Sequence, residues 1–332
     1  MIYKTFQDLR LSALGMGCMR LPLKGGVTEI DEHETACMIA YALEHGINYF
    51  DTAWGYHGGS SETVMGKVLS AYPRDRFFLA SKFPGYDLGN MPKVQEIFAR
   101  QLEKCQCGHF DFYLFHNVCE LNIDAYLNKE YGILDHLLKQ KEAGRIRHLG
   151  FSAHGSLDVM KRFLNAYVEL LNAHHIPIWV MEPLRGGKLA ALSQEDAAAL
   201  QALRPAESIP GWAFRFLQSI PGVTMILSGM SSMPQLQDNV RTFASEQPLN
   251  DNEMKELLRI GGHMGASVPC TACHYCTTHC PQKLDIPELI RLYNDMVFSN
   301  GSFSARNAIN AMPAEKQPSA CLGCGSCPTA GL

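Results

Sequence analysis

The sequence predicts an α/β fold, and two features between residue 11 and about residue 240 support it. First, seven short runs are apolar on both faces, which is typical of strands in a covered parallel sheet. These runs are residues 14–21, 48–50, 77–80, 112–115, 146–151, 176–181 and 223–227. Second, amphipathic segments separate the runs, so that strands and helices alternate along the chain. At this length the alternation favours a (β/α)8 barrel of the TIM type.

Four segments between the apolar runs are expected to be helices. Residues 31–45 place their apolar side chains on one face and stop at Gly46, a residue that commonly ends helices. Ser61 is the expected N-cap of the second helix, and Pro92 is the expected start of the third. The fourth helix is expected to run unbroken over residues 124–143.

One strand of an eight-stranded barrel is missing from this pattern. Between Phe151 and Ile176 the chain has the apolar spacing of a single amphipathic helix. A helix–strand–helix passage there needs roughly 30 residues or more, and the chain supplies fewer. We therefore expect a barrel that lacks one strand unit near residues 165–175.

The composition limits the classes of function. Hydrophobic residues make up 46% of the 332 residues, which is enough to bury a core. The formal net charge is −4 and no block of like charges occurs, so neither nucleic acid nor an anionic membrane is an expected partner. No apolar run approaches the ~18 residues of a membrane span, and residues 1–20 do not resemble a signal peptide. We expect a cytoplasmic protein.

Polar side chains stand at the ends of three consecutive predicted strands. Asp51 and Tyr56 follow the second strand, Lys82 follows the third, and His116 follows the fourth. Each residue alone could be structural, as a turn cap, a solvated strand end or a core histidine. However, the C-terminal strand ends form the active-site face of a barrel, so the four groups should converge there.

Together these groups suit the reduction of a carbonyl. Tyr56 could donate a proton to the developing alkoxide if Lys82 lowered the pKa of its phenol. Asp51 would keep Lys82 charged by ion pairing. His116 could donate to the substrate oxygen and orient it.

This part of the chain resembles the aldo/keto reductase family. The matching segments are residues 51–56, 61–62, 81–82, 115–116, 150–152, 181–187 and 228–232, with Asn239. The resemblance covers about residues 1–262. It implies an NAD(P)H-dependent oxidoreductase that interconverts small carbonyls and alcohols on a (β/α)8 barrel. It also implies that Tyr56 is the proton donor and that Asp51, Lys82 and His116 support it.

The resemblance further implies which residues bind NADP or NAD. They are Gly17, Ser152, Pro183, Leu184, Gly186, Ser228, Gly229, Gln235 and Asn239. Backbone amides of residues 228–232 and the helix N-terminus that follows could hold a phosphate. Gly229 and Gln235 replace the basic residues with which many family members grip the 2′-phosphate, and Ala153 replaces a frequent asparagine. The choice between NADP and NAD therefore stays open.

Seven of the twelve cysteines fall in two groups in the last part of the sequence. The first group is Cys270, Cys273, Cys276 and Cys280, the last followed by Pro281. This spacing is typical of bacterial ferredoxins that bind 4Fe–4S clusters. Zinc is the alternative, but zinc sites usually pair two Cys-x2-Cys units or add histidines. We therefore predict a small, mostly α-helical ferredoxin-like domain over residues 263–332, including a helix at 285–298, after a barrel domain over residues 1–262.

The second group contains three cysteines and leaves the number of clusters open. They are Cys321, Cys324 and Cys327, and Gly331 stands where a fourth would be due. In two-cluster ferredoxins the cysteine before the proline ligates the other cluster, so Cys280 would complete this second set. The first set would then keep three thiolates, for a three-iron cluster or a four-iron cluster with a non-cysteine ligand. Alternatively, one cluster could use Cys270 to Cys280 alone.

The two modules predict an aldo/keto-reductase-type oxidoreductase with one or two iron–sulfur clusters. The clusters would serve structure, or would exchange electrons with a redox partner protein. The alternative is a non-enzymatic iron–sulfur electron-transfer protein whose barrel has lost catalysis with its missing strand.

Overall fold

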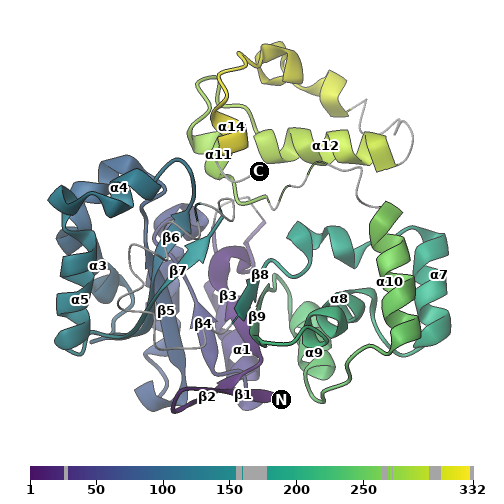
Figure 1. The fold of residues 1–332 in the computed structure, drawn as a ribbon, viewed down its shortest axis with the longest axis horizontal. Coiled ribbons are helices and arrows are strands. Elements are labelled where there is room, and N and C mark those ends of the chain that lie inside the picture. Colours follow the sequence, from purple (N-terminus) through teal and green to yellow (C-terminus); the bar gives the residue numbers. More distant parts are fainter. Residues whose placement is uncertain are drawn as a thin grey trace. The chain divides into compact units, whose positions relative to one another are not determined.

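The computed structural model describes residues 1–25, 29–154, 159, 178–263, 268, 270, 272–298 and 308–329. The chain divides into two compact units (Figure 1). The first unit comprises Met1–Pro183 and Ala213–Pro248, and the second comprises Leu184–Trp212 and Leu249–Leu332. The predicted domain boundary after residue 262 differs from this division and stays a prediction.

The first unit is built on a parallel sheet. Among the described residues the sheet has seven strands in the order β7-β6-β5-β4-β3-β9-β8. The strands are β3 (Leu14–Gly17), β4 (Tyr49–Asp51), β5 (Phe78–Phe83), β6 (Phe110–Val118), β7 (Ile146–Ala153), β8 (Ile178–Met181) and β9 (Val223–Gly229). Every pairing between them is parallel, which confirms the α/β alternation predicted from the apolar runs. The strand predicted to be missing near residues 165–175 lies outside the described residues.

The sheet curves so that its two ends approach each other. An antiparallel hairpin of β1 (Tyr3–Phe6) and β2 (Leu9–Ser12), which the sequence analysis missed, carries Phe6. The centroid of the Phe6 ring lies 5.7 Å from the ring centroid of Phe112 on β6 and 5.8 Å from that of Trp179 on β8. The rings of Phe112 and Trp179 are themselves 4.8 Å apart. Because β6 and β8 are far apart in the strand order, this contact requires the barrel-like curvature of the sheet.

Helices connect the strands of the first unit, and α3 and α5 lie outside β5 and β7 (Figure 1). The α-helices are α1 (Glu32–Glu44), α2 (Ser61–Leu69), α3 (Val94–Lys104), α4 (Ile123–Leu127), α5 (Ile133–Glu142) and α9 (Met233–Thr242). Helix α8 (Ile209–Gln218) crosses from the second unit into the first. The prediction that Gly46 ends α1 is confirmed, since Gly46 follows the C-cap with a φ of +88°.

Three helix boundaries were predicted wrongly. Ser60, not Ser61, is the N-cap of α2, because the Ser61 hydroxyl is turned into the core. Pro92 lies in a 3-10 helix, η4 (Leu88–Lys93), before α3 begins. The helix expected over residues 124–143 is broken by η5 (Lys129–Tyr131) and by Gly132 at a φ of +58°, a conformation that cannot continue an α-helix.

The described elements of the second unit are helical. They are η6 (Arg185–Ala190), α7 (Gln194–Leu203), α10 (Asp251–His263), α11 (Tyr275–Thr278), α12 (Ile286–Phe298), η8 (Ala314–Lys316), η9 (Pro318–Ala320) and α14 (Ser326–Thr329). The helix predicted at residues 285–298 is confirmed as α12. Helices α7 and α10 share an apolar core that includes Leu200 and Ile260. Arg204 and Glu253 form an ion pair at 2.6 Å between the end of α7 and α10. No helix in the described ranges is long and apolar enough to cross a bilayer.

Gly66→Ala is expected to destabilise the first unit by about 1–3 kcal/mol. A Cβ atom at Gly66, on α2, would lie 2.3 Å from the carbonyl oxygen of Lys104 and 2.6 Å from the carbonyl carbon of Cys105. Both are backbone atoms at the end of α3, which cannot move aside cheaply. Thermal unfolding followed by circular dichroism measures the effect. Gly108→Ala is the matched control, because no heavy atom lies within 4 Å of a Cβ there; equal melting temperatures for the two variants would contradict the prediction.

Candidate active site

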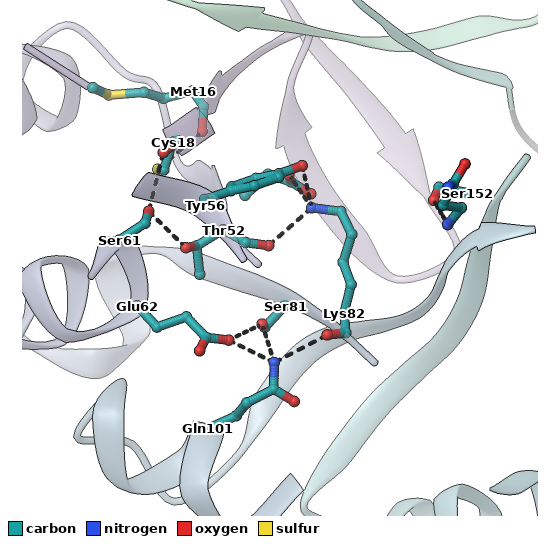
Figure 2. Close-up of polar contacts among 12 residues, drawn as sticks. Met16, Cys18, Thr52, Tyr56, Ser61, Glu62, Ser81, Lys82, Gln101 and Ser152 are labelled. Atoms are coloured by element: carbon teal, nitrogen blue, oxygen red, sulfur yellow. Dashed lines mark hydrogen bonds and ion pairs between the residues drawn. The ribbon is translucent and has the colours of Figure 1, made fainter. Parts of the chain in front are cut away.

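Lys82 is at the centre of the predicted site and is fully buried, at 0% exposure. Figure 2 shows its ammonium group pointing toward Tyr56 and Thr52. Within the described part of the chain, Lys82 Nζ donates to Asp51 Oδ1 at 2.6 Å, to the carbonyl oxygen of Thr52 at 2.8 Å and to the hydroxyl oxygen of Tyr56 at 3.2 Å. An ammonium group has three N–H bonds, so these contacts account for all of them. The Tyr56 hydroxyl is an acceptor here, and its own proton is therefore left to be donated elsewhere.

The strand register brings these groups together. Asp51 is the last residue of β4, and Ala80 of β5 lies opposite it. Lys82 is two residues beyond Ala80 and therefore points to the same face of the sheet. Lys82 in turn pairs with Leu114 of β6, and His116 is two residues beyond Leu114. Alternation along parallel strands thus places Asp51, Lys82 and His116 on one face.

His116 lies beside two tyrosine rings. Its ring centroid is 5.9 Å from that of Tyr56 and 5.3 Å from that of Tyr86, in edge-to-face geometry in both cases. His116 is 2% exposed. The structure therefore brings all four predicted residues together. It adds Tyr86, which the sequence analysis missed because it lies in the loop after β5, where no periodic pattern marks it.

Burial dominates the protonation of the site. It raises the pKa of Tyr56 well above the usual value for tyrosine, and the negative charge of Asp51 adds to the rise. This differs from the expectation that Lys82 lowers that pKa. Burial also lowers the pKa of His116 well below its usual value, and the charge of Lys82 lowers it further. At neutral pH the site therefore presents a neutral phenol and a neutral imidazole, both able to donate a hydrogen bond.

A second polar network lies on the opposite face of β5, where Ser81 points (Figure 2). The carboxylate of Glu62 accepts from Ser81 Oγ at 2.6 Å, from Gln101 Nε2 at 2.5 Å and from Lys104 Nζ at 2.7 Å. Gln101 Nε2 also donates to the carbonyl oxygen of Lys82 at 3.0 Å. Glu62, Ser81 and Gln101 are each 0% exposed. This network holds the backbone of Lys82 from the face of β5 opposite the Lys82 side chain.

Several of the predicted cofactor-binding residues meet at the ends of β3 and β9. Gly17 lies opposite Gly229 in the register of these strands. Asn239 Nδ2 donates to Ser228 Oγ at 3.1 Å, and the Gln235 side chain accepts from the backbone N–H of Ser231 at the start of α9. A basic residue that the sequence analysis did not consider, Arg20, lies beside Gly229, since a Cβ there would be 3.2 Å from Arg20 Cβ.

The remaining predicted cofactor-binding residues lie elsewhere. Ser152, at the end of β7, accepts the backbone N–H of Asn117 through its Oγ at 2.8 Å. Pro183 follows β8 in the first unit, whereas Leu184 and Gly186 belong to the second. No ligand-binding role of any of these residues is tested by the geometry, and their assignment stays a prediction.

The predicted cluster ligands lie in the second unit. Cys276 is buried with Leu284 and Ile286, and Cys280 and Cys327 pack against this core. Burial raises the pKa of Cys276 to about 11, and the charges of Cys273, Cys270 and Cys327 contribute to the rise. Burial also raises the pKa of Cys327, and the charges of the neighbouring thiols raise it further. These thiols are Cys321, Cys324 and Cys280. Cys276, Cys280 and Cys327 therefore pack together, but among the described residues no group of three or more His, Cys, Asp or Glu side chains is arranged to hold a metal ion.

The unfolding free energy is expected to fall as the pH drops from about 6.5 to about 4. Burial, with Lys82 as the second cause, lowers the pKa of His154 to about 4 in the folded chain. An unfolded histidine titrates near 6.5, so in this window the unfolded state binds about one more proton at this position. Denaturant unfolding at a series of pH values measures the slope. His154→Gln should show a shallower pH dependence, and identical slopes for the variant and the wild type would contradict the prediction.

Known proteins are similar to the part of the chain that contains Asp51, Tyr56, Lys82 and His116. Residues 13–171 match the model of the aldo/keto reductase family. The oxidoreductase YqkF of Bacillus subtilis (strain 168), itself uncharacterized, is 22% identical over 298 residues, which cover 75% of this chain and 92% of the relative. L-galactose dehydrogenase of Arabidopsis thaliana is 23% identical over 282 residues, which cover 73% of this chain and 87% of the relative.

Solved structures share the fold. The holo form of the aldo-keto reductase AKR11C1 from Bacillus halodurans superposes with a TM-score of 0.60 at 24% identity, covering 76% of this chain and 93% of that one. The thermostable aldo-keto reductase Tm1743, in complex with the inhibitor epalrestat, gives a TM-score of 0.62 at 20% identity, covering 79% of this chain and 100% of that one. At these identities the superpositions establish the fold alone. The family match ends at residue 171, well before the two cysteine groups.

Proposed function

We propose that this chain is an enzyme of the aldo/keto reductase type and that it transfers hydride between NAD(P)H and a small carbonyl or alcohol at Tyr56. The observation that carries the proposal is the hydrogen bonding of Lys82. Its ammonium donates to the Tyr56 hydroxyl oxygen at 3.2 Å, so the phenol proton is directed away from Lys82 and toward the substrate. The same family comparisons favour an enzyme over the non-enzymatic alternative.

The site residues would act on the substrate oxygen. The nicotinamide, when bound, supplies the hydride to the carbonyl carbon. Tyr56 donates its phenol proton to the carbonyl oxygen, which yields the alcohol and leaves a phenolate. Because burial makes a phenolate costly at this position, the buried cation of Lys82 is needed to stabilise it. His116, as a neutral imidazole, donates a hydrogen bond that holds the substrate oxygen near Tyr56.

The residues that gather at the ends of β3 and β9 suit a dinucleotide. Gly17 and Gly229 pair side by side there, and the amides at the N-terminus of α9 can donate to a phosphate. Ser228 and Asn239 add a pair of hydrogen-bonded polar side chains to this region. We infer that these residues hold the cofactor phosphates, and Arg20 beside Gly229 contributes positive charge to the same region.

A binding titration followed by a turnover assay tests this proposal. Purified anaerobic protein is titrated with NADPH and, in parallel, with NADH, while its tryptophan fluorescence is recorded. We expect saturable quenching, followed by oxidation of the reduced cofactor when small aldehydes or ketones are added. A comparison of the two dissociation constants identifies the preferred cofactor. Absence of binding to either cofactor would overturn the proposal.

We also propose that the two cysteine groups hold at least one 4Fe–4S cluster. The Cys270–Cys280 spacing supports iron–sulfur ligation over zinc, and Cys276, Cys280 and Cys327 share one buried core although they come from both groups. The cluster would serve structure or exchange single electrons with a redox partner protein. Nicotinamide transfers two electrons together, whereas the cluster transfers one. We therefore assign no step of the carbonyl reduction to the cluster.

Metal analysis of protein purified without oxygen tests the cluster. We expect about four iron and four sulfide per chain for one 4Fe–4S cluster, and about seven or eight iron with about eight sulfide for two clusters. Cys276→Ala should lower the iron content, whereas Cys37→Ala on α1, outside both groups, should not. Zinc in place of iron, or equal iron in both variants, would overturn the assignment.

A further inference from the structure

We propose that a β-bulge at His116 and Asn117, anchored by the side chains of Ser152, Asn122 and Tyr126, positions His116 in the active site. The inference rests on the proposed function, because it concerns the residue assigned there to the substrate oxygen. The bulge is visible in the pairing of β6 with β7. Phe115 pairs with Phe151 and Val118 pairs with Ala153, so β6 advances three residues while β7 advances two. β6 therefore contains one extra residue at this point.

The backbone of the bulge adopts a conformation that asparagine can adopt but most residues avoid. Asn117 has a φ of +59°, in the left-handed region. Bulges next to functional sites commonly redirect a side chain, and sparsely populated backbone conformations persist only where the surroundings hold them. What holds Asn117 in this conformation is therefore informative about function.

Side chains, rather than strand pairing, satisfy the polar groups of the bulge. The N–H of Asn117 donates to Ser152 Oγ at 2.8 Å, and its carbonyl oxygen accepts from Asn122 Nδ2 at 2.8 Å. The carbonyl oxygen of His116 accepts from the Tyr126 hydroxyl at 2.8 Å. These three anchoring residues are each 2–3% exposed. The peptide group between His116 and Asn117 is therefore held at both its N–H and its carbonyl oxygen, and this fixes the direction of the His116 Cα–Cβ bond.

The same two side chains, Asn122 and Tyr126, reach the loop that follows Lys82. Tyr126 accepts the N–H of Gly85 at 3.1 Å, and Asn122 Nδ2 also lies 3.2 Å from the carbonyl oxygen of Gly85. A Cβ atom at Gly85 would lie 2.2 Å from the Tyr126 hydroxyl, so the close approach requires glycine there. The ends of β5 and β6 are thus joined through one buried set of hydrogen bonds. This arrangement fixes the spacing between Lys82 and His116.

Asn122 makes these bonds at the expense of its helix. It occupies the N-cap position of α4, where an asparagine side chain ordinarily accepts an N–H of the first turn. No such cap bond forms, and its Oδ1 accepts the N–H of Cys119 at 3.0 Å instead. An uncapped helix and a left-handed asparagine are both unfavourable locally. Their occurrence together at His116 indicates a positioning role beyond the stability of the fold.

A double-mutant cycle separates positioning from structure. Tyr126→Phe keeps the ring and removes the hydroxyl that holds the His116 carbonyl. The same hydroxyl also accepts the Gly85 N–H. We expect kcat to fall roughly five- to tenfold, because the His116 carbonyl loses its hydrogen bond, with little change in KM or in cofactor binding. In a His116→Ala background the same change should have almost no further effect on kcat, because Tyr126 acts through His116. Tyr131→Phe, in η5, is the matched control and should leave kcat unchanged.

A second pair of variants tests the backbone conformation. Asn117→Gly and Asn117→Ala remove nearly the same side chain, but only glycine adopts the left-handed conformation without strain. We expect Asn117→Gly to retain several-fold more activity than Asn117→Ala. Equal loss in this pair, or the same factor for Tyr126→Phe with and without His116, would overturn the proposal.

Hydrogen exchange keeps the inference separate from the proposed function. The amides of residues 115–119 should exchange faster in Tyr126→Phe than in the wild type, and at the wild-type rate in Tyr131→Phe. If the wild type reduces no carbonyl, the proposed function fails, but the exchange rates still decide whether Tyr126 holds the bulge at His116. Unchanged exchange in Tyr126→Phe would overturn the anchoring whatever the activity.

Discussion

Tyr56→Phe is expected to lower the rate of carbonyl reduction by about 10²- to 10⁴-fold, the usual contribution of a positioned general acid. The substitution removes the hydroxyl that Lys82 contacts at 3.2 Å and keeps the ring that packs edge-on against His116. The packing around the ring should therefore be preserved while the proposed proton donor is lost. Cofactor binding, which we assign by proposal to residues at the ends of β3 and β9, should not change.

Steady-state kinetics and the cofactor titration together check this expectation. The loss should appear in kcat, and the dissociation constant of the reduced cofactor should match the wild type. Tyr41→Phe, on the outer helix α1 where its ring stacks on His45, is the control and should keep full activity. A Tyr56→Phe enzyme that retains more than about a tenth of the wild-type kcat would assign the proton to another donor.

Lys82→Met is expected to lower the unfolding free energy by about 3–5 kcal/mol, because it leaves a buried carboxylate without its cation. Asp51 is 4% exposed, and within the described ranges its Oδ2 has no hydrogen-bond partner. The Lys82 ammonium at 2.6 Å is thus the main compensation for the burial of this charge. The backbone contact to Thr52 is lost in the same variant.

The pH dependence of this destabilisation has a defined sign. Burial raises the pKa of Asp51 above its usual value of 3.8, and Lys82 opposes the rise. Without Lys82 the folded-state pKa should rise further above the unfolded value. The variant should therefore be closest to wild-type stability below about pH 4, where the carboxyl is protonated in both states, and should lose stability as the pH rises.

Urea denaturation of matched variants measures both effects. The double variant Asp51→Asn with Lys82→Met removes the charge from both partners and should recover part of the lost stability. If it is no more stable than Lys82→Met alone, the buried charge is not the cause of the loss. Reading the midpoints at two pH values, one acid and one neutral, distinguishes loss of charge compensation from loss of packing volume.

The strands and the polar residues of the site could be predicted because both follow from local spacing. A strand covered on both faces is apolar throughout, so the seven runs identified the seven strands of the parallel sheet in the part of the chain that the structure describes. The carboxyl ends of parallel barrel strands meet on one face, and therefore the positions of Lys82 and His116 at strand ends were enough to predict that they converge. The hairpin β1–β2 was missed, because its mixed residues carry no comparable run.

The polar contacts behind the site could not be predicted, because they join residues from loops and helices with no common period. Tyr86, Asn122 and Tyr126 reach the site only through the path of the backbone after β5 and β6. Gly132 similarly breaks a helix whose apolar pattern continues past it. The bulge at Asn117 depends on Ser152, which lies 35 residues away in the chain.

The sequence alone indicated the α/β alternation and the ferredoxin-like spacing of the cysteines, since both depend on separations of a few residues. It also predicted that Asp51, Tyr56, Lys82 and His116 converge, because the carboxyl ends of parallel barrel strands meet on one face. The pKa of Tyr56 shows where that reasoning stops. The sequence indicated a lysine that lowers it, whereas the folded chain raises it by excluding water and by placing Asp51 nearby. Exclusion of water depends on every element packed around a group, and only the tertiary structure decides it.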